Sequence, residues 1–300
     1  MSLFDTIKSF FPLKLTEDQK ATILHTTSNL NVVDAVKQIQ KETGLEPTGK
    51  VDAATYRRVN TETLAHEIDK GPKVSQTVTS SPGHSTIIVD GKHVPIEWGR
   101  VVRFSDSNGL AFKSNKTVTN GRTIDGVITH WDVCLSAKSC WQVLQPPRQA
   151  STHFCIDNDG TIYQFMDTKD VAWHSGIGSV NKRTIGVDLS NAVYEKYNPT
   201  YEKMGFGSRP VLNSMVHGKP LRHLGWYPAQ IDAYKALLAC LSDSVGVRLQ
   251  YPTDKDGGLL KRFDASCVNF KGVQNHYNIR ADKIDCAGLP LDEIIKSIRK

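Results

Sequence analysis

The sequence predicts an α/β domain with a mixed central sheet flanked by helices, preceded by a small helical module. Three observations lead to this fold class. Near the N-terminus, apolar residues recur at helical spacing. Beyond residue 85, two apolar stretches are each interrupted by an Asp-Gly pair, which is a hairpin signal. Strand-like and helix-like segments then alternate toward the C-terminus, which is typical of α/β folds.

The N-terminal module is predicted to contain two helices. The apolar positions of the first recur every three to four residues: Val32, Val36 and Ile39. Gly44 is expected to end this helix, because glycine adopts the left-handed conformation that closes many helices. After a Pro-Thr-Gly turn, Asp52 is expected to cap a second helix that runs through Tyr56.

The rest of the chain is divided by composition. Residues 65–84 are rich in Ser, Thr, Pro and Gly without periodicity, which indicates a linker. We therefore expect a module over residues 1–64 and a second domain over residues 85–300. In that domain, Asp90-Gly91 and Asp159-Gly160 mark hairpins. A helix is predicted to begin near Pro228, with these apolar positions along one face: Ile231, Tyr234, Leu238 and Leu241.

Composition excludes several classes of protein. The chain is 39% hydrophobic and 23% charged, and it contains no apolar run of the roughly 20 residues that cross a bilayer. The formal charge of +6 comes entirely from residues after 65, which suits an anionic partner and equally a solvated basic surface without a partner. No nucleic-acid motif is present. Six cysteines without a CxxC pair argue against a disulfide scaffold and a cysteine-cage zinc site. The N-terminus lacks the cleavage site of a secretory signal, so we expect synthesis in a cytoplasm.

Two histidines and one carboxylate are the candidates for a metal site. His130 ends the apolar run DGVITH, and His276 lies in VQNHYNIRADKIDCAG, which also contains Asp285. Two imidazoles, a carboxylate and a water make the open tetrahedral site of a catalytic zinc. Sequence spacing alone leaves open whether the three converge.

The N-terminal module resembles a known family. Its run AVKQIQKETGL, followed by TGKVDAATY, is similar to the helical peptidoglycan-binding module found beside many wall hydrolases. The alternative is an unrelated pair of small helices.

Five segments of the second domain resemble, in order, the zinc-dependent N-acetylmuramoyl-L-alanine amidases. This family includes amidase-type phage lysins and the animal peptidoglycan recognition proteins. The segments are VITHWD, STHFCIDNDGTIYQF, VAWHSG, NKRTIGVDLSN and a C-terminal H-x6-K-I-D-C-A-G. The resemblance implies the amidase fold and hydrolysis of the bond between N-acetylmuramic acid and L-alanine by a zinc-activated water.

The resemblance also implies roles for individual residues. His130, His276 and Asp285 match the three zinc ligands. Lys283 matches a lysine two positions before the third ligand, and it is expected to stabilise the oxyanion. Asp188 matches a position where some members carry a catalytic glutamate, and it is the candidate for proton transfer.

Three further residues are expected to line the substrate cleft: Trp173, His174 and Thr152. Two departures from the family pattern concern proton transfer. Thr152 stands where some members have a catalytic tyrosine, and Asp188 is one methylene shorter than glutamate. His174 is therefore an alternative proton shuttle.

Three questions about nearby residues stay open. Cys286 is an alternative third ligand. His153 matches a family position, but a buried, hydrogen-bonded structural histidine is favoured there. Cys134 and Cys140 resemble the disulfide pair of the animal recognition proteins, and two free thiols are an equal alternative in a reducing cytoplasm.

The sequence therefore predicts a monomeric, bacteriolytic enzyme that resembles a bacteriophage endolysin, with zinc as cofactor and bacterial peptidoglycan as partner. We expect it to bind no nucleic acid and no membrane stably, and to reach the wall after lysis or on a virion. The alternative is a non-catalytic peptidoglycan recognition protein, which would have no need of all three ligands.

Overall fold

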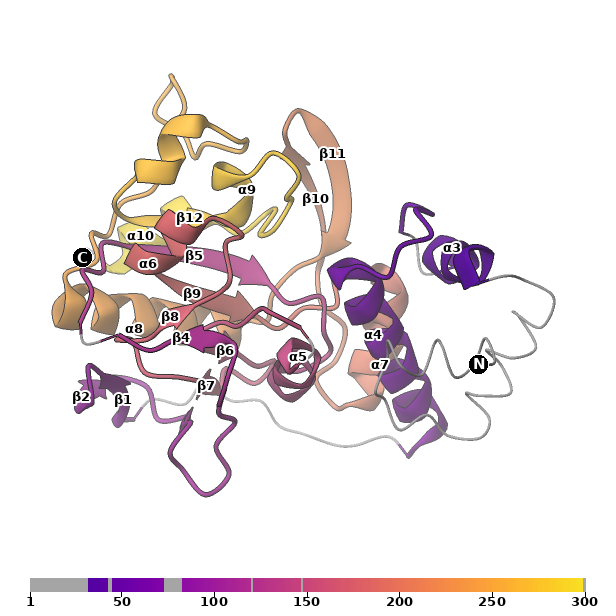
Figure 1. Cartoon of the computed structure of the whole chain (residues 1–300), viewed down its shortest axis with the longest axis horizontal. Coiled ribbons are helices and arrows are strands. Elements are labelled where there is room, and N and C mark those ends of the chain that lie inside the picture. The colour runs from indigo at the N-terminus through magenta and orange to yellow at the C-terminus, as the bar shows by residue number, and fades with distance from the viewer. Residues whose placement is uncertain (1–31, 43–44, 73–82, 120, 147, 299–300) are drawn as a thin grey trace. The chain divides into compact units, whose positions relative to one another are not determined.

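The computed structural model describes residues 32–42, 45–72, 83–119, 121–146 and 148–298. The chain forms two compact units, Met1–Pro72 and Lys73–Lys300 (Figure 1). The predicted helix stop at Gly44 and half of the predicted linker, residues 73–82, lie outside the described residues. Residues 65–70 of the predicted linker belong instead to the helix Ala53–Lys70. Within the described part, no helix has the length and apolar character to cross a membrane.

The N-terminal unit contains the two predicted helices, α3 (Val32–Glu42) and α4 (Ala53–Lys70). Asp52 caps α4 as predicted, because its carboxylate accepts the backbone N–H of Thr55 at 2.8 Å. The buried Gln40 side chain holds the connection between the helices. It accepts the N–H of Gly49 at 2.8 Å and donates to the Lys50 carbonyl at 2.9 Å.

The second unit is built on a mixed six-stranded sheet with the order β12-β5-β9-β6-β7-β3. Only the β6–β7 pair in this sheet is antiparallel. The fold class predicted from sequence is confirmed. The sheet strands are β3 (Val101–Arg103), β5 (Gly126–Trp131), β6 (Phe154–Ile156), β7 (Ile162–Gln164), β9 (Thr184–Leu189) and β12 (Val273–Asn275).

Short strand pairs and helices surround this sheet. The paired strands are β1 (Ser85–Val89) with β2 (Lys92–Ile96), β4 (Lys116–Thr117) with β8 (Val171–Ala172), and β10 (Val211–Val216) with β11 (Lys219–Leu224). The helices are α5 (Ala137–Leu144), α6 (Gly178–Arg183), α7 (Asn198–Lys203), α8 (Pro228–Val245), α9 (His276–Ile279) and α10 (Leu291–Ile298), with 3-10 segments η1 (Glu195–Tyr197) and η2 (Ala265–Asn269).

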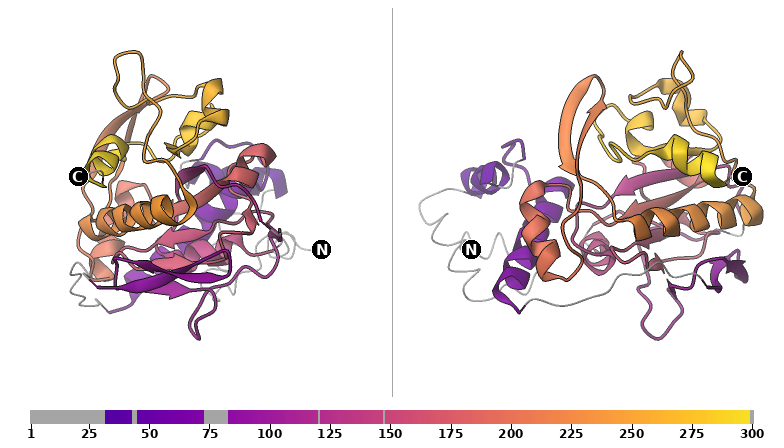
Figure 2. Two further views of the ribbon diagram at one scale, coloured as in Figure 1. Left: turned by 90° about the vertical axis from the view of Figure 1, so that its left-hand side faces the viewer. Right: turned by 180° about the vertical axis from the view of Figure 1, so that it is seen from behind.

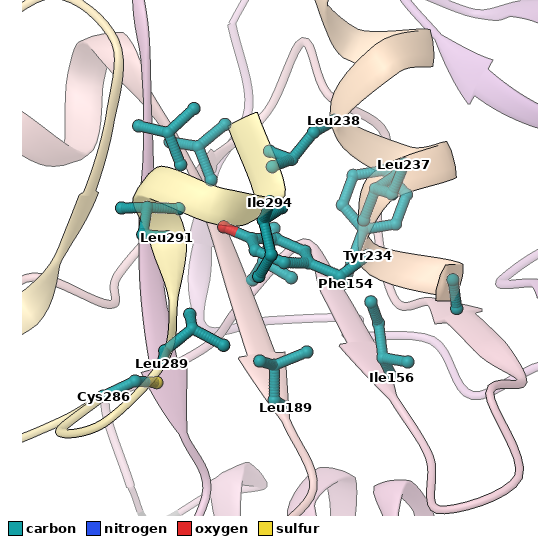
Figure 3. Close-up of a cluster of buried hydrophobic side chains, with 14 of the residues drawn as sticks. Phe154, Ile156, Leu189, Tyr234, Leu237, Leu238, Cys286, Leu289, Leu291 and Ile294 are labelled. Atoms are coloured by element: carbon teal, nitrogen blue, oxygen red, sulfur yellow. The ribbon is translucent and has the colours of Figure 1, made fainter. Parts of the chain in front are cut away.

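Helices α8 and α10 cover one face of the sheet, and the right panel of Figure 2 shows α8 lying in front of the strands. The predicted helix at Pro228 is confirmed, and it ends at Gly246, which adopts the left-handed conformation. Inward-facing residues of β6 and β9 pack against this helix (Figure 3). The buried side chains in this close-up include Phe154, Ile156, Leu189, Tyr234, Leu237, Leu238 and Ile294.

A second, smaller cluster lies on the opposite face of β5. Ile128 packs there with residues from α6, α9 and η2: Val180, Ile279 and Cys267. Side chains alternate along a strand, so His130 emerges on the same face as Ile128. The fold thus places His130 away from the large core and at the carboxyl end of β5.

The two hairpins predicted from Asp-Gly pairs are present. Asp90 and Gly91 form the two-residue turn between β1 and β2, with φ values of 48° and 76°. Both values are positive, as a type I′ turn requires. Asp159 and Gly160 lie in the connection between β6 and β7. A third hairpin, β10–β11, lies in a segment for which the sequence analysis predicted no strands.

Candidate metal centre

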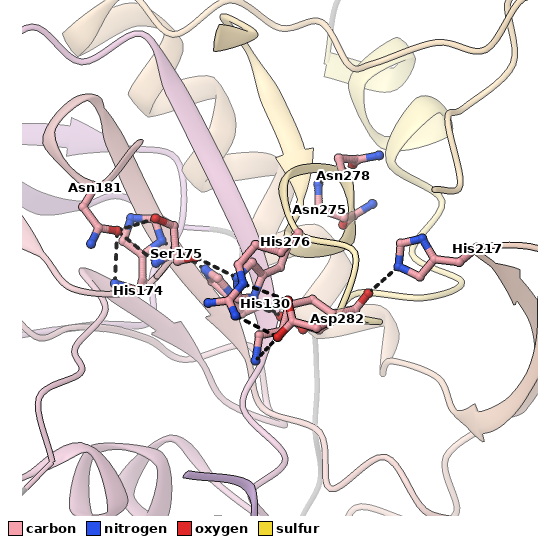
Figure 4. A network of polar contacts seen from close by, with 12 residues as sticks. His130, His174, Ser175, Asn181, His217, Asn275, His276, Asn278 and Asp282 are labelled. Atoms are coloured by element: carbon pink, nitrogen blue, oxygen red, sulfur yellow. Dashed lines mark hydrogen bonds and ion pairs between the residues drawn. The ribbon is translucent and has the colours of Figure 1, made fainter. Parts of the chain in front are cut away.

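His130, His276 and Asp285 converge on one point. Figure 4 shows the two histidines next to each other. His130 lies near the end of β5, and His276 directly follows the neighbouring strand β12. These strands are parallel, with Asn275 opposite Thr129, so both histidines reach the same edge of the sheet. The loop after α9 returns Asp285 to this edge, where its backbone carbonyl accepts the N–H of Tyr277 at 3.0 Å.

The three ligand atoms are spaced as a small cation requires. Nδ1 of His130 lies 3.1 Å from Nδ1 of His276 and 3.1 Å from Oδ2 of Asp285. Nδ1 of His276 lies 3.0 Å from the same oxygen. Ligands bonded tetrahedrally to zinc at about 2.0–2.1 Å are about 3.3 Å apart, so the donor set fits this ion with shifts of a few tenths of an ångström.

Hydrogen bonds select the ring tautomers that leave both Nδ1 atoms free to bind a metal. Nε2 of His276 donates to the carbonyl of Ser175 at 3.1 Å, so its proton is on Nε2. For His130, the tautomer is set by a chain of hydrogen bonds through two more residues, His174 and Thr184. The Thr184 hydroxyl donates to Val180, so its oxygen accepts Nε2–H of His174 at 3.2 Å.

Nδ1 of His174 consequently carries a lone pair and accepts Nε2–H of His130 at 3.1 Å. This leaves Nδ1 of His130 unprotonated. Two nitrogen lone pairs and a carboxylate oxygen then face one another at about 3 Å, an arrangement that a bound cation stabilises. The chemistry of the donor set therefore fits a divalent metal.

Gly186 on β9 makes room for this hydrogen-bond chain. A Cβ atom at residue 186 would lie 2.7 Å from Cγ of His174, closer than side-chain atoms pack. The imidazole therefore rests directly on the backbone of β9. The backbone N–H of His174 also donates to the side chain of Asn181 at 3.3 Å, which holds this residue in place.

Burial dominates the electrostatics of the centre. It lowers the pKa of His174 well below its ordinary value, with nearby His130 adding to the effect. It also lowers the pKa of His276. Burial acts to raise the pKa of Asp285, and the charge of protonated His276 and His130 lowers it far below its ordinary value. Beside neutral imidazoles, a bound cation would supply that positive charge instead. Neutral imidazoles and an ionised carboxylate are the ligand forms that zinc binds.

Asp188 lies beside the centre on the next strand. It is the register partner of His130 and is buried, so its carboxylate emerges on the same face of the sheet. A second buried carboxylate, Asp132, lies near it. Burial and then the charge of Asp188 raise the pKa of Asp132 to about 7.

Lys283 lies two residues before Asp285, and its side chain is 36% exposed. The ammonium group lies 3.7 Å from the carboxylate of the neighbouring Asp282. Its backbone N–H donates to Arg280 at 3.3 Å. Lys283 is thus on the loop that carries Asp285, and the contact of its charge in this structure is with Asp282.

The other predicted cleft residues differ in exposure. Trp173 is partly exposed, and its indole N–H donates to Thr117 at 3.1 Å. Thr152 is buried, and its hydroxyl donates to the carbonyl of Phe154 at 3.3 Å. The Thr152 hydroxyl is therefore directed at the first residue of β6.

His153 is a structural histidine, as the sequence interpretation favoured. It is fully buried, and its Nδ1 accepts the N–H of Gly186 at 3.0 Å. Its Nε2 donates to the carbonyl of Asp170 at 3.0 Å. Burial and the charge of Arg122 lower its pKa well below the ordinary value.

All six cysteines are buried, and no disulfide joins Cys134 to Cys140 in this structure. Cys286 points into the large core beside Leu289 (Figure 3), and Asp285 alone of this pair belongs to the histidine group.

A second cluster of potential ligands contains Asp132, Cys140 and Cys155. The Asp132 carboxylate is already satisfied by hydrogen bonds. It accepts from the backbone of Cys134 at 2.9 Å and Asn191 at 3.0 Å, and from the Ser190 hydroxyl at 2.7 Å. Its role is structural.

Sequence reasoning missed the residues that orient the ligands. Ser175 acts through its backbone carbonyl, which no side-chain pattern reveals. Thr184 opens the strand TIGVDL and gave no signal of its own. The spacing Thr184-x-Gly186-x-Asp188, with alternate residues on one face, could have indicated that these three face the histidines.

Comparison with known proteins gives two family matches. The family described as N-acetylmuramoyl-L-alanine amidase matches residues 120–285. The family described as a peptidoglycan binding domain matches residues 26–59. No curated protein matches the chain.

Similar solved structures include a mutant endolysin from Bacillus subtilis. It is 14% identical, with a TM-score of 0.36, and the match covers 66% of this chain and 98% of that one. The N-acetylmuramoyl-L-alanine amidase LysC from Clostridium intestinale is 15% identical, with a TM-score of 0.36 and coverage of 67% and 98%. The Staphylococcus aureus hydrolase AmiA in complex with its ligand is 14% identical, with a TM-score of 0.40 and coverage of 67% and 82%.

The first family match spans more than half of the chain and includes all three converging residues. The chain therefore belongs to the N-acetylmuramoyl-L-alanine amidase family.

Proposed function

We propose that this amidase hydrolyses the bond between N-acetylmuramic acid and L-alanine with a zinc ion held by His130, His276 and Asp285. The observation that supports the metal is the convergence of these three ligand atoms at 3.0–3.1 Å, with both imidazoles in the ligand tautomer. A zinc ion in this site would activate water at neutral pH and polarise the scissile carbonyl.

The residues of the chain have separate tasks in this proposal. Lys283 supplies positive charge to the carbonyl oxygen as negative charge develops on it. This requires its flexible side chain to leave Asp282 for the substrate. Asp188 accepts a proton from the attacking water and passes it to the leaving amine. His174 is engaged through both ring nitrogens, so we assign it the orientation of His130 rather than proton transfer.

We further propose that residues 1–64 bind the wall and that residues 85–300 catalyse the cleavage. The support is a peptidoglycan binding domain match over residues 26–59 and an amidase match that begins at residue 120. A wall-binding module joined to a hydrolase is the organisation of a bacteriolytic lysin. We propose this role, with action on the bacterial wall after phage-induced lysis.

The test combines metal analysis with product identification. We expect one zinc per chain, and mass spectrometry of digested peptidoglycan should show free stem peptides that begin with L-alanine. His130→Ala should lose zinc and activity, whereas His93→Ala, at an exposed histidine on β2, should lose neither. Active wild-type protein without zinc would refute the metal assignment, and cleavage within the stem peptide would refute the bond assignment.

A further inference from the structure

The turn of the β10–β11 hairpin contacts the loop that carries Lys283. Nε2 of His217 donates to the backbone carbonyl of Lys283 at 2.7 Å, and Figure 4 shows the bond as a dashed line from His217. Nδ1 of the same ring accepts the N–H of Phe263 at 3.1 Å. The backbone N–H of His217 donates to Lys261 at 3.0 Å. One histidine thus joins three separate segments.

Histidine is an uncommon choice for this turn. Val216 pairs with Lys219, so His217 and Gly218 form a two-residue turn, with φ values of 53° and 75°. Such a type I′ turn favours Asn-Gly or Asp-Gly, whose first residue tolerates a positive φ. The turn itself gains nothing from an imidazole. The longer ring does reach the carbonyl of Lys283.

The contacted loop is held locally by backbone hydrogen bonds and by the Arg280–Asp282 ion pair, but its side chains before Asp285 are exposed. Ile284 is 42% exposed, and the side chains of Asp282 and Lys283 are 58% and 36% exposed. The loop therefore lacks an apolar anchor immediately before Asp285. The hairpin supports it at a second point, because a Cβ atom at Gly288 would lie 2.5 Å from Oγ of Ser214. Both ends of the Lys283–Gly288 segment thus rest on the hairpin.

We propose that His217 is a positioning residue, which fixes the Lys283 peptide so that the lysine ammonium reaches the scissile carbonyl. This inference rests on the proposed function, because it assigns the oxyanion charge to Lys283. A displacement of about 1 Å in a catalytic group can cost on the order of 100-fold in rate. A flexible lysine on a loop whose side chains are largely exposed is sensitive to such a displacement.

The test compares two substitutions of His217 in the full-length, zinc-loaded protein. His217→Asn keeps an acceptor near the Nδ1 position and suits the turn, but it is too short to reach Lys283. His217→Gln extends a donor to about the Nε2 position. We expect Asn to lower kcat about 10-fold to 100-fold on a soluble muropeptide, with KM and zinc content unchanged and Tm maintained. Gln should recover kcat to within about threefold of wild type. Lys219→Ala, on the same hairpin, should change nothing.

A double-mutant cycle identifies the route of the effect. If His217 acts through Lys283, His217→Asn should cause no further loss in a Lys283→Ala background. If the losses of the two single variants multiply in the double variant, the proposal for His217 is wrong. It is also wrong if His217→Asn has wild-type kcat while Lys283→Ala is impaired. Neither outcome contradicts the role proposed for Lys283. A Lys283→Ala enzyme with undiminished kcat instead refutes the role given to Lys283 in the proposed function.

Discussion

At the scale of single residues, the ordering of protons around the ligands is the informative feature. The Val180 carbonyl, which can only accept, fixes the direction of every hydrogen bond from Thr184 through His174 to His130. The Nδ1 lone pair of His130, the proposed metal ligand, is thereby fixed by a carbonyl three hydrogen bonds away. Outer partners of this kind commonly account for 10-fold to 100-fold in metal affinity.

Thr184→Val tests this ordering. The substitution keeps the shape of the side chain and removes the hydroxyl that accepts from His174. We expect zinc affinity to fall about 10-fold to 100-fold while the fold is retained. Thr129→Val is the matched control, because Thr129 is a buried threonine on β5 whose hydroxyl contacts Tyr234 on the opposite face. If both variants bind zinc as tightly as wild type, the ordering of protons does not contribute to zinc affinity.

Lys283 and Asp188 allow separate tests of charge stabilisation and proton transfer. Lys283→Ala should lower kcat about 10²-fold to 10³-fold with zinc still bound, which is the effect of removing one oxyanion donor.

Asp188→Asn keeps shape and removes charge, and a loss of about 10²-fold to 10⁴-fold in kcat would mark Asp188 as the proton carrier. A loss below about fivefold for Asp188→Asn would leave it a structural carboxylate.

At the scale of elements, strand ends and tight turns explain what the sequence could predict. The run DGVITH predicted that a buried strand delivers His130 to its end, and the Asp-Gly pairs predicted two hairpins, because both signals are local. The hairpin β10–β11 carries His-Gly in place of Asn-Gly and a proline in its second strand, so the local signal is weak. Its contact with Lys283 joins residues 66 positions apart and has no local signal.

The tautomer chain could not be predicted for a related reason. It depends on β5 and β9 being neighbours in register, so that Gly186 leaves space for His174 opposite His130. Strand order is a property of the whole sheet, and spacing along the chain does not encode it. The family motifs supplied the ligands, but the structure supplied the groups that orient them.

The connection between β6 and β7 allows a prediction about pH. Burial raises the pKa of Asp157 to about 6, with Asp159 adding to the effect and Arg209 opposing it. Between its unfolded and folded pKa values, the native state binds more protons than the unfolded state. The Asp157 contribution to stability is therefore fully present at acid pH and is lost as pH rises toward about 6.

Asp157→Asn should remove this loss, because the amide cannot ionise and can still accept the N–H of Asn158. Denaturant unfolding at pH 4.5 and 7.5 is the measurement. Relative to wild type, we expect the variant to gain about 2 kcal/mol between these two pH values. A stability difference that does not vary with pH would mean that Asp157 titrates normally in the native state.

At the scale of the whole molecule, the two compact units divide the chemistry. The described part of the N-terminal unit contains His66 as its sole histidine and holds none of the residues that converge at the metal centre. All the positive charge excess lies after residue 65. The second unit therefore carries both the centre and the charge that favours an anionic wall polymer.

Removal of the N-terminal unit tests this division. A chain of residues 85–300 should hydrolyse soluble muropeptides with wild-type kcat, because the sheet and all three ligands lie within it. On intact sacculi its rate should fall at least about 10-fold, because a tethered wall-binding module raises the effective concentration of enzyme at its substrate. The soluble substrate is the control for damage to the catalytic unit, and sedimentation of residues 1–72 with sacculi checks binding directly. A truncated enzyme that clears sacculi as fast as the full chain would show that wall affinity resides in the second unit itself, which carries the excess of positive charge.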